Sequence, residues 1–261
     1  VVDAGANDVT LTAGTSAARG AITATANSLI SGHALTATAS AIGTANSAVN
    51  TRIDTLTATA TQGSVYIAEQ NGLTLANVSA SGAGSDVDVR SATGDIVVET
   101  VSAVDEVRLT ATGGAIADDG DDTTLITGNA LVLQAASIGE GSTLTGGVLD
   151  KRYRLDTDVT SLTATASAGG VFIDELNGLQ SVEISAAGGS AGDVELLTAT
   201  GDLVIRSVTA SDTVLLAAGG NLFTTQNAPS VQITARAAEL RAGAVDPSAG
   251  RIGTFDRPFT L

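Results

Sequence analysis

The sequence has no cysteine, methionine or tryptophan, and aromatic residues make up only 2% of its 261 residues. Without cysteine, the chain cannot use disulfide bonds, a thiol nucleophile or a thiolate metal site. Without large rings, an interior must be narrow enough for Val, Ile, Leu and Ala to fill it. A solenoid, in which each coil buries a thin core against its neighbours, has that geometry.

Positive charge is also scarce. The chain carries 12 Lys and Arg against 28 Asp and Glu, a net charge of −16. So acidic a surface repels nucleic acid and anionic lipid, and we expect neither nucleic-acid binding nor membrane insertion. No apolar run approaches the roughly 18 residues that a membrane-spanning helix needs. The chain starts and stops within its own pattern, which predicts a segment of a longer protein.

The strongest signal in the sequence is self-similarity. Thr55–Ala60 recurs as Ser161–Ala166, and Ser64–Leu73 recurs as Gly170–Leu179, each at a distance of 106 positions. Such repetition indicates a repeat architecture with about two and a half copies of one unit. We therefore predict one continuous solenoid over 1–261, built from a partial copy (1–50), a first copy (51–156, with an insertion near 140–154) and a second copy (157–261).

Within each unit, short runs alternate apolar and polar residues, as at 86–89, 95–98 and 106–109. This period of two is typical of a half-buried strand, and the Gly, Asn, Asp and Ser residues between the runs form turns. Every second run lies about 20 residues further on. The pattern predicts an all-β fold, a parallel β-helix of about a dozen coils, with Leu56, Ala58 and Ala60 pointing inward.

Ile252–Phe259 reads Ile-Gly-Thr, then Phe-Asp-Arg, then Pro-Phe, and its first two residues recur without the proline at Ile42-Gly43 and Ile138-Gly139. This junction, together with Leu162–Ala166 and Gly170–Leu179, resembles the repeats of bacterial large exoproteins of the filamentous-haemagglutinin type. The resemblance implies a right-handed parallel β-helix. It also implies export across an outer membrane and work at the cell surface as an adhesin or fibre.

One acidic run is a candidate calcium site, through Asp118, Asp119, Asp121 and Asp122. Calcium prefers six to eight oxygen ligands from a flexible loop. The run lacks the spaced ligands and closing Glu of an EF-hand, so a solvated turn is the default interpretation. Residues 82–86 are a weaker candidate, similar to half of a calcium-binding nonapeptide. No other cofactor is expected.

Acids two positions apart, Asp86 with Asp88 and Asp193 with Glu195, are the only hint of β-helix carbohydrate chemistry. On the outer face of strands, such acids also keep a rod soluble. His33 is the single histidine and is expected to be a solvent-facing turn residue. The only basic cluster, 151–154, is expected to be an exposed loop, or else to dock an acidic neighbour. We expect no enzymatic activity.

The sequence therefore predicts a structural segment of a secreted protein, an adhesin stalk or extracellular filament at the bacterial cell surface. Its partners would be neighbouring repeats of the same parent chain, or further copies assembled end to end. The alternative is a rod whose face binds a glycan or a host receptor. Ice binding by outward threonines ranks lower, because the runs at Leu35, Leu56, Leu109, Leu162 and Leu197 are not one coil apart.

Overall fold

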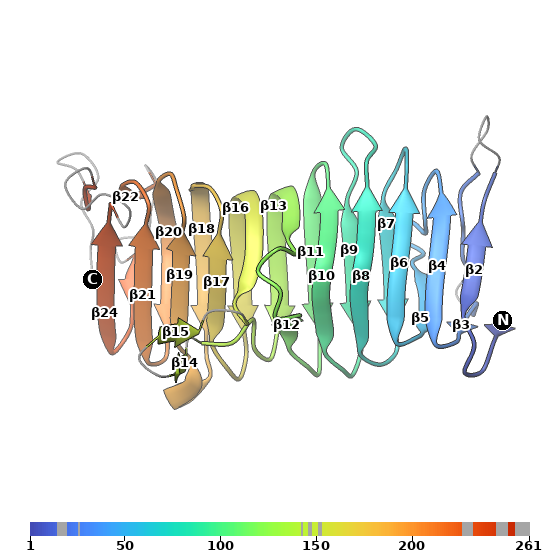
Figure 1. The fold of residues 1–261 in the computed structure, drawn as a ribbon, viewed down its shortest axis with the longest axis horizontal. Coiled ribbons are helices and arrows are strands. Elements are labelled where there is room, and N and C mark those ends of the chain that lie inside the picture. Colours follow the sequence, from blue (N-terminus) through green and yellow to red (C-terminus); the bar gives the residue numbers. More distant parts are fainter. Residues whose placement is uncertain are drawn as a thin grey trace.

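A computed structural model describes residues 1–14, 20–25, 27–141, 143–145, 148–150, 153–225, 232–243 and 250–253. Strands make up 58% of it and helix 1%. The strands stack in parallel into a β-solenoid of about nine turns with a spacing of about 23 residues, and the rod runs continuously from end to end (Figure 1). The predicted fold class is confirmed, with about nine turns in place of the expected dozen coils of about 20 residues.

Two ladders of parallel strands, here called ladder A and ladder B, form the walls of the rod and alternate along the chain. Ladder A holds β2 (Val9–Thr12), β4 (Ala34–Ala39), β6 (Thr55–Ala60), β8 (Leu73–Ala80), β10 (Ile96–Ala103), β12 (Ile116–Asp118), the first parts of β13 (Ile126–Ala135) and β16 (Leu155–Ala166), β17 (Val171–Glu175), β19 (Val194–Thr198), β21 (Thr213–Ala218) and β24 (Ala237–Ala242). Ladder B holds β1 (Val2–Asp3), β3 (Ile30–Ser31), β5 (Val49–Arg52), β7 (Val65–Glu69), β9 (Val87–Ser91), β11 (Glu106–Ala111), the second parts of β13 and β16, β18 (Leu179–Ala186), β20 (Leu203–Ala210), β22 (Leu222–Thr224) and β23 (Ile233–Thr234). A short 3-10 turn, η1 (Gly189–Ala191), and a hairpin of β14 (Thr143–Thr145) and β15 (Val148–Asp150) lie outside the ladders.

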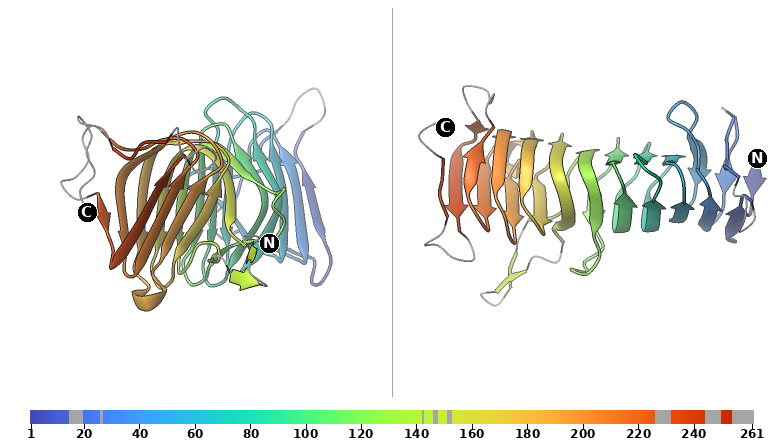
Figure 2. Two further views of the ribbon diagram at one scale, coloured as in Figure 1. Left: turned by 60° about the vertical axis from the view of Figure 1, so that its left-hand side comes forward. Right: turned by 90° about the horizontal axis from the view of Figure 1, so that it is seen from above.

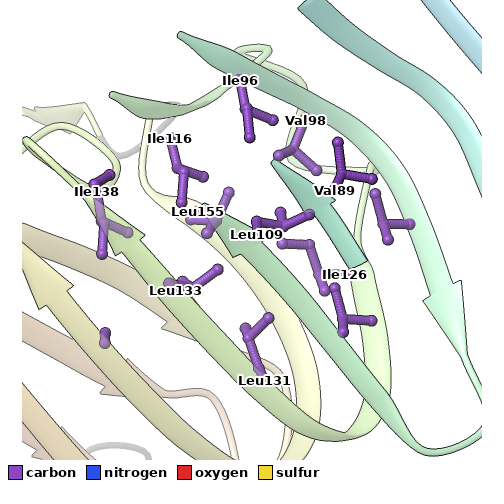
Figure 3. Packing of buried hydrophobic residues seen from close by; sticks show 14 of the residues in the cluster. Val89, Ile96, Val98, Leu109, Ile116, Ile126, Leu131, Leu133, Ile138 and Leu155 are labelled. Atoms are coloured by element: carbon purple, nitrogen blue, oxygen red, sulfur yellow. The ribbon is translucent and has the colours of Figure 1, made fainter. Parts of the chain in front are cut away.

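The core lies between the ladders and is aliphatic throughout the described chain. Leu56, Ala58 and Ala60 are fully buried, as predicted, and Val65 and Ile67 are buried beside Tyr66, which points outward. Figure 3 shows one section of this interior, where side chains from β9 to β13 and β16 meet. Small Ala beside branched Leu, Val and Ile fills a thin interior without aromatic rings, which explains their scarcity.

The 106-residue repeat places equivalent strands in opposite ladders. β6 belongs to ladder A, whereas its repeat equivalent, Ser161–Ala166 of β16, belongs to ladder B. β7 and β17 are related in the same way, with β7 in ladder B and β17 in ladder A. At about 23 residues per turn, 106 residues span about four and a half turns, not the five whole coils expected. Successive units therefore present the same surface on opposite faces of the rod.

The Ile-Gly pairs mark a repeated junction in three dimensions. Ile42 bridges to Val65, and Ile138 bridges to Val171. The glycines that follow have φ of +67° at Gly43 and +61° at Gly139. A Cβ on either glycine would lie within 2.6 Å of a carbonyl oxygen in the next coil. Glycine is required here both by its left-handed backbone and by the close packing of coils. In the third pair, Gly253 also has a positive φ, whereas residues 254–259 lie outside the described chain.

Substitution of Gly139 by alanine is expected to destabilise the rod by about 3 kcal/mol or more, since the new Cβ would lie 2.3 Å from the Phe172 carbonyl oxygen. Gly189→Ala is the matched control, because its φ is +62° with no atom within 4 Å of the added Cβ. It should cost only about 1 kcal/mol of backbone strain. Chemical denaturation measures both, and equal losses would show that the close approach of coils is not what requires Gly139.

The outward threonines form longer rows than the sequence indicated. Thr10, Thr36 and Thr57 pair in register across β2, β4 and β6, and a parallel row contains Thr38 and Thr59. The expectation that the Leu35 and Leu56 runs do not stack was wrong, because the turn between them is short and brings β4 directly beside β6. The Leu162 run lies in ladder B and does not extend these rows.

Candidate functional site

Two segments that interrupt the repeat come together on the face of ladder A. One is the turn 119–125 between β12 and β13, which contains most of the acidic run, and the other is the insertion between Ile138 and β16. The ring of Tyr153 lies against Gly120, 3.0 Å from the position of a Cβ there, and the ring of Phe172 lies under Gly141. The β14–β15 hairpin of the insertion projects from the side of the rod (Figure 2).

Arg154 is buried at this meeting point, with only 2% of its side chain exposed. Its guanidinium forms an ion pair with Asp174 at 3.0 Å and a second one with Glu195. The expectation of an exposed loop was therefore wrong for Arg154, which docks on acidic neighbours. The register of the strands explains these contacts. Leu155 pairs with Ile173, so Arg154, one residue earlier, lies on the outer face beside Phe172. Phe172 in turn pairs with Glu195, which brings Glu195 within reach of Arg154. Lys151 and Arg152 lie outside the described residues.

Beside this ion-pair cluster lies a groove of about 440 Å³. Its floor follows one register row of ladder A, in which Asp156, Asp174, Leu197 and Ala217 pair in succession. The row changes from acidic to apolar along the rod. The complete lining comprises Asp122, Thr123, Thr124, Leu125, Asp156, Thr157, Asp174, Glu175, Leu176, Leu197, Thr198, Ala199 and Ala217. A volume of this size fits a small organic ligand.

Negative charge is concentrated at the acidic end of the groove. Burial, together with the neighbouring carboxylates of Asp118 and Asp174, raises the pKa of Asp156 to about 7. Burial also raises the pKa of Asp118 to about 6, although the backbone N–H of Gly120 donates to its carboxylate and lowers the value. Groups with these pKa values exchange protons near neutral pH, and a cation bound beside them would favour their charged forms.

Two further acids are buried inside the rod, Glu69 and Glu175, each 2% exposed. The carboxylate of Glu69 accepts hydrogen bonds from Thr51 Oγ1 at 2.6 Å and from the backbone N–H groups of Ile53, Gln70 and Asn71. Glu175 repeats this arrangement. Burial raises the pKa of both, to about 7 for Glu175. These glutamates tie a strand end to the turn of the adjacent coil.

The acids proposed for calcium mostly hold the turn itself. Asp118 accepts from the Gly120 N–H, Asp119 from the Asp121 N–H and the Thr124 hydroxyl, and Asp121 from the Thr123 N–H and hydroxyl. Asp122 lines the groove. Across the described part of the chain, no group of three or more His, Asp or Glu side chains is placed to hold a metal ion. Calcium binding by this run stays a prediction.

The other candidates are separated and partnered. His33 is exposed, as predicted, and lies 3.0 Å from Asp8, much as its repeat counterpart Asn129 contacts Asp105. Arg90 holds Asp88 through two hydrogen bonds.

Of the remaining acids, Asp86 accepts from the Tyr66 hydroxyl and Asp193 from Thr213, while Glu195 pairs with Arg154. The four acids therefore bind side chains of their own or neighbouring coils.

Two features escaped the sequence reasoning, and one of them had a visible signal. Alternation from Val65 and Ile67 places Glu69 at an inward position, and the same holds for Glu175 in the second copy. A charged residue that recurs at an inward position predicts a buried hydrogen-bonded group. Asp156 had no such signal, because its place in the groove depends on where the insertion returns the chain to ladder A.

Comparisons with models of protein families, with curated proteins and with solved structures gave no match for this chain. Among the described residues, the search for helices long and apolar enough to cross a membrane found none. The fold and the groove are thus the basis for assigning a function.

Proposed function

We propose that the chain is a non-enzymatic structural segment of a secreted protein at the bacterial cell surface, where it forms part of an adhesin stalk or an extracellular filament. The observation that carries the proposal is the continuity of the two ladders, which run through the described parts of all three repeat units without a break in pairing. A fold that grows by adding coils is suited to building length. The resemblance to filamentous-haemagglutinin-type exoproteins supports the same role.

The repeat geometry and the charge fit this role. A unit of about four and a half turns shows equivalent surfaces on both sides of the rod, so tandem units build a straight body with two similar faces. The net charge of −16 keeps neighbouring rods apart in solution. The natural partners are then neighbouring repeats of the parent chain, or copies that stack end to end by pairing of edge strands.

The alternative function is a rod whose outer face binds a glycan or a host receptor. The groove on ladder A is the observation in its favour, because it is a recessed surface specific to one place in the repeat. The described groove lining contains no aromatic residue on which a sugar ring would stack. This is why the structural role is preferred.

Negative-stain electron microscopy of the purified chain, combined with a glycan array, tests the proposal. We expect rods of uniform width, either single or joined into longer fibres, and no specific glycan signal. Rods of one length would identify a stalk segment, and fibres longer than one molecule would identify a filament subunit. Specific glycan binding would replace the proposal with the binding alternative, and cleavage of a polysaccharide would contradict the non-enzymatic assignment.

A further inference from the structure

The groove on ladder A differs from the same place in the preceding repeat copy, which makes an internal comparison possible. The residues that hold the framework are the same in both copies: Thr157 and Glu175 correspond to Thr51 and Glu69, with equivalent hydrogen bonds. The groove-facing residues are different. Asp156 stands where the preceding copy has Asn50, and Asp174 stands where it has Ala68.

The connection that leads into β13 beside the groove is also acidic in this copy and uncharged in the preceding one. Residues 119–125, which lead into β13, correspond to residues 23–29, which lead into β3, and the earlier connection contains no acidic residue. The fold therefore accepts uncharged residues at each of these places. Asp122 and Asp156 are thus not required by the solenoid, whereas Asp174 pairs with the buried Arg154. The partial burial of Asp156 costs free energy that an uncharged side chain would not.

The charge of the groove is not balanced by the cation beside it. Arg154 is directed to Asp174 and Glu195, and it leaves Asp156 and Asp122 without an ion pair among the described residues. Further along the groove the surface is apolar, through Leu176, Leu197 and Ala217. A ligand that complements both ends has one positive charge and a short apolar chain. Neither a metal ion nor a neutral sugar has this combination.

We propose that the groove binds a primary alkylammonium group, with the ammonium beside Asp122 and Asp156 and the alkyl chain against Leu176, Leu197 and Ala217. The ammonium donates to the carboxylates, and the chain buries its methylene groups on the apolar end. A free amine and the lysine side chain of a partner protein share this chemistry. The inference is independent of the proposed structural role, since a rod without this groove would serve as a stalk equally well.

Isothermal titration calorimetry of the full chain at low salt tests the proposal with methylammonium, pentylammonium and Nα-acetyl-lysine methylamide. We expect saturable binding of pentylammonium at least tenfold tighter than that of methylammonium, because four more methylene groups reach the apolar end. Binding of both pentylammonium and the lysine amide would show that a lysine side chain fits. Binding of pentylammonium alone would identify a free amine as the ligand.

The matched variant is Asp156→Asn, which installs the residue that the fold already accepts at Asn50 and leaves the ion pair between Arg154 and Asp174 intact. We expect it to melt cooperatively like the wild type and to bind pentylammonium at least tenfold more weakly. Asp54→Asn removes the same kind of charge from an exposed turn and should leave binding unchanged. The proposal is overturned if pentylammonium does not bind, if affinity is independent of chain length, or if the groove variant binds as well as the wild type. Equal binding of 1-pentanol or CaCl₂ would overturn it too.

Discussion

Asp156→Asn is expected to stabilise the protein at pH 8 by about 1–3 kcal/mol and to leave its stability at pH 4 nearly unchanged. Burial and neighbouring carboxylates raise the pKa of Asp156 from 3.8 to about 7 in the folded chain. Below pH 3.8 both states hold the proton, and the raised pKa favours the folded state fully. As the pH rises towards 7, the unfolded chain ionises first and the folded state loses this advantage.

The wild type should therefore lose several kcal/mol of unfolding free energy between about pH 4 and pH 7.5, since Asp118 and Glu175 act in the same direction. Their effects are coupled, so the total is smaller than the sum of the three. Urea denaturation across this pH range measures the loss, and Asp156→Asn should remove a substantial part of the slope. Asp54→Asn should reproduce the wild-type slope. A groove variant no more stable than the wild type at pH 8 would show that the carboxyl is not under electrostatic strain.

Loss of a buried glutamate is expected to have the larger destabilising effect. Glu69→Ala leaves the Thr51 hydroxyl and the N–H groups of Ile53 and Asn71 without their acceptor. Each buried donor that loses its partner costs about 1–3 kcal/mol, so a loss of about 3–5 kcal/mol is expected. Glu175→Ala should cost a similar amount, because the same contacts recur half a rod away.

The double variant separates a local role from a long-range one. The two glutamates have no shared partner, so their effects should add within about 0.5 kcal/mol while the chain still unfolds as one unit. Glu99→Ala, on the outer side of β10, is the control and should change stability by about 0.5 kcal/mol or less. If Glu69→Ala lowered the free energy of unfolding as little as Glu99→Ala, the hydrogen bonds around Glu69 would not contribute to the stability of the contact between coils.

The sequence contains enough information to assign the fold, because the period of two is read directly from runs such as 86–89 and 106–109. These became β9 and β11, which pair with an offset of 20 residues. The mean turn was harder to predict, since β11 pairs with β13 at an offset of 24 and β13 with β16 at 31. Longer connections at a few turns raise the average number of residues per turn to about 23. As a result, equivalent positions of successive repeat units lie about half a turn apart.

The groove was only partly visible in the sequence. The sequence singled out the acidic run as a candidate site and residues 140–154 as an insertion, but no pattern indicates that the two segments meet in space. Their contact depends on the register by which Leu155 pairs with Ile173 and brings Arg154 beside Asp174. Such a register is fixed by how the ends of the insertion pack against the rod, which a single sequence does not specify.

Each 106-residue unit is expected to add about four and a half turns to one uninterrupted rod. A chain in which residues 51–156 are duplicated in tandem tests it directly, with its length measured by small-angle X-ray scattering and electron cryo-microscopy. At a strand spacing of about 4.8 Å, the rod should lengthen by about 22 Å at constant width, and the groove on residues 156–217 should move to the opposite face. An unchanged length, or a second body joined by a flexible break, would contradict the claim.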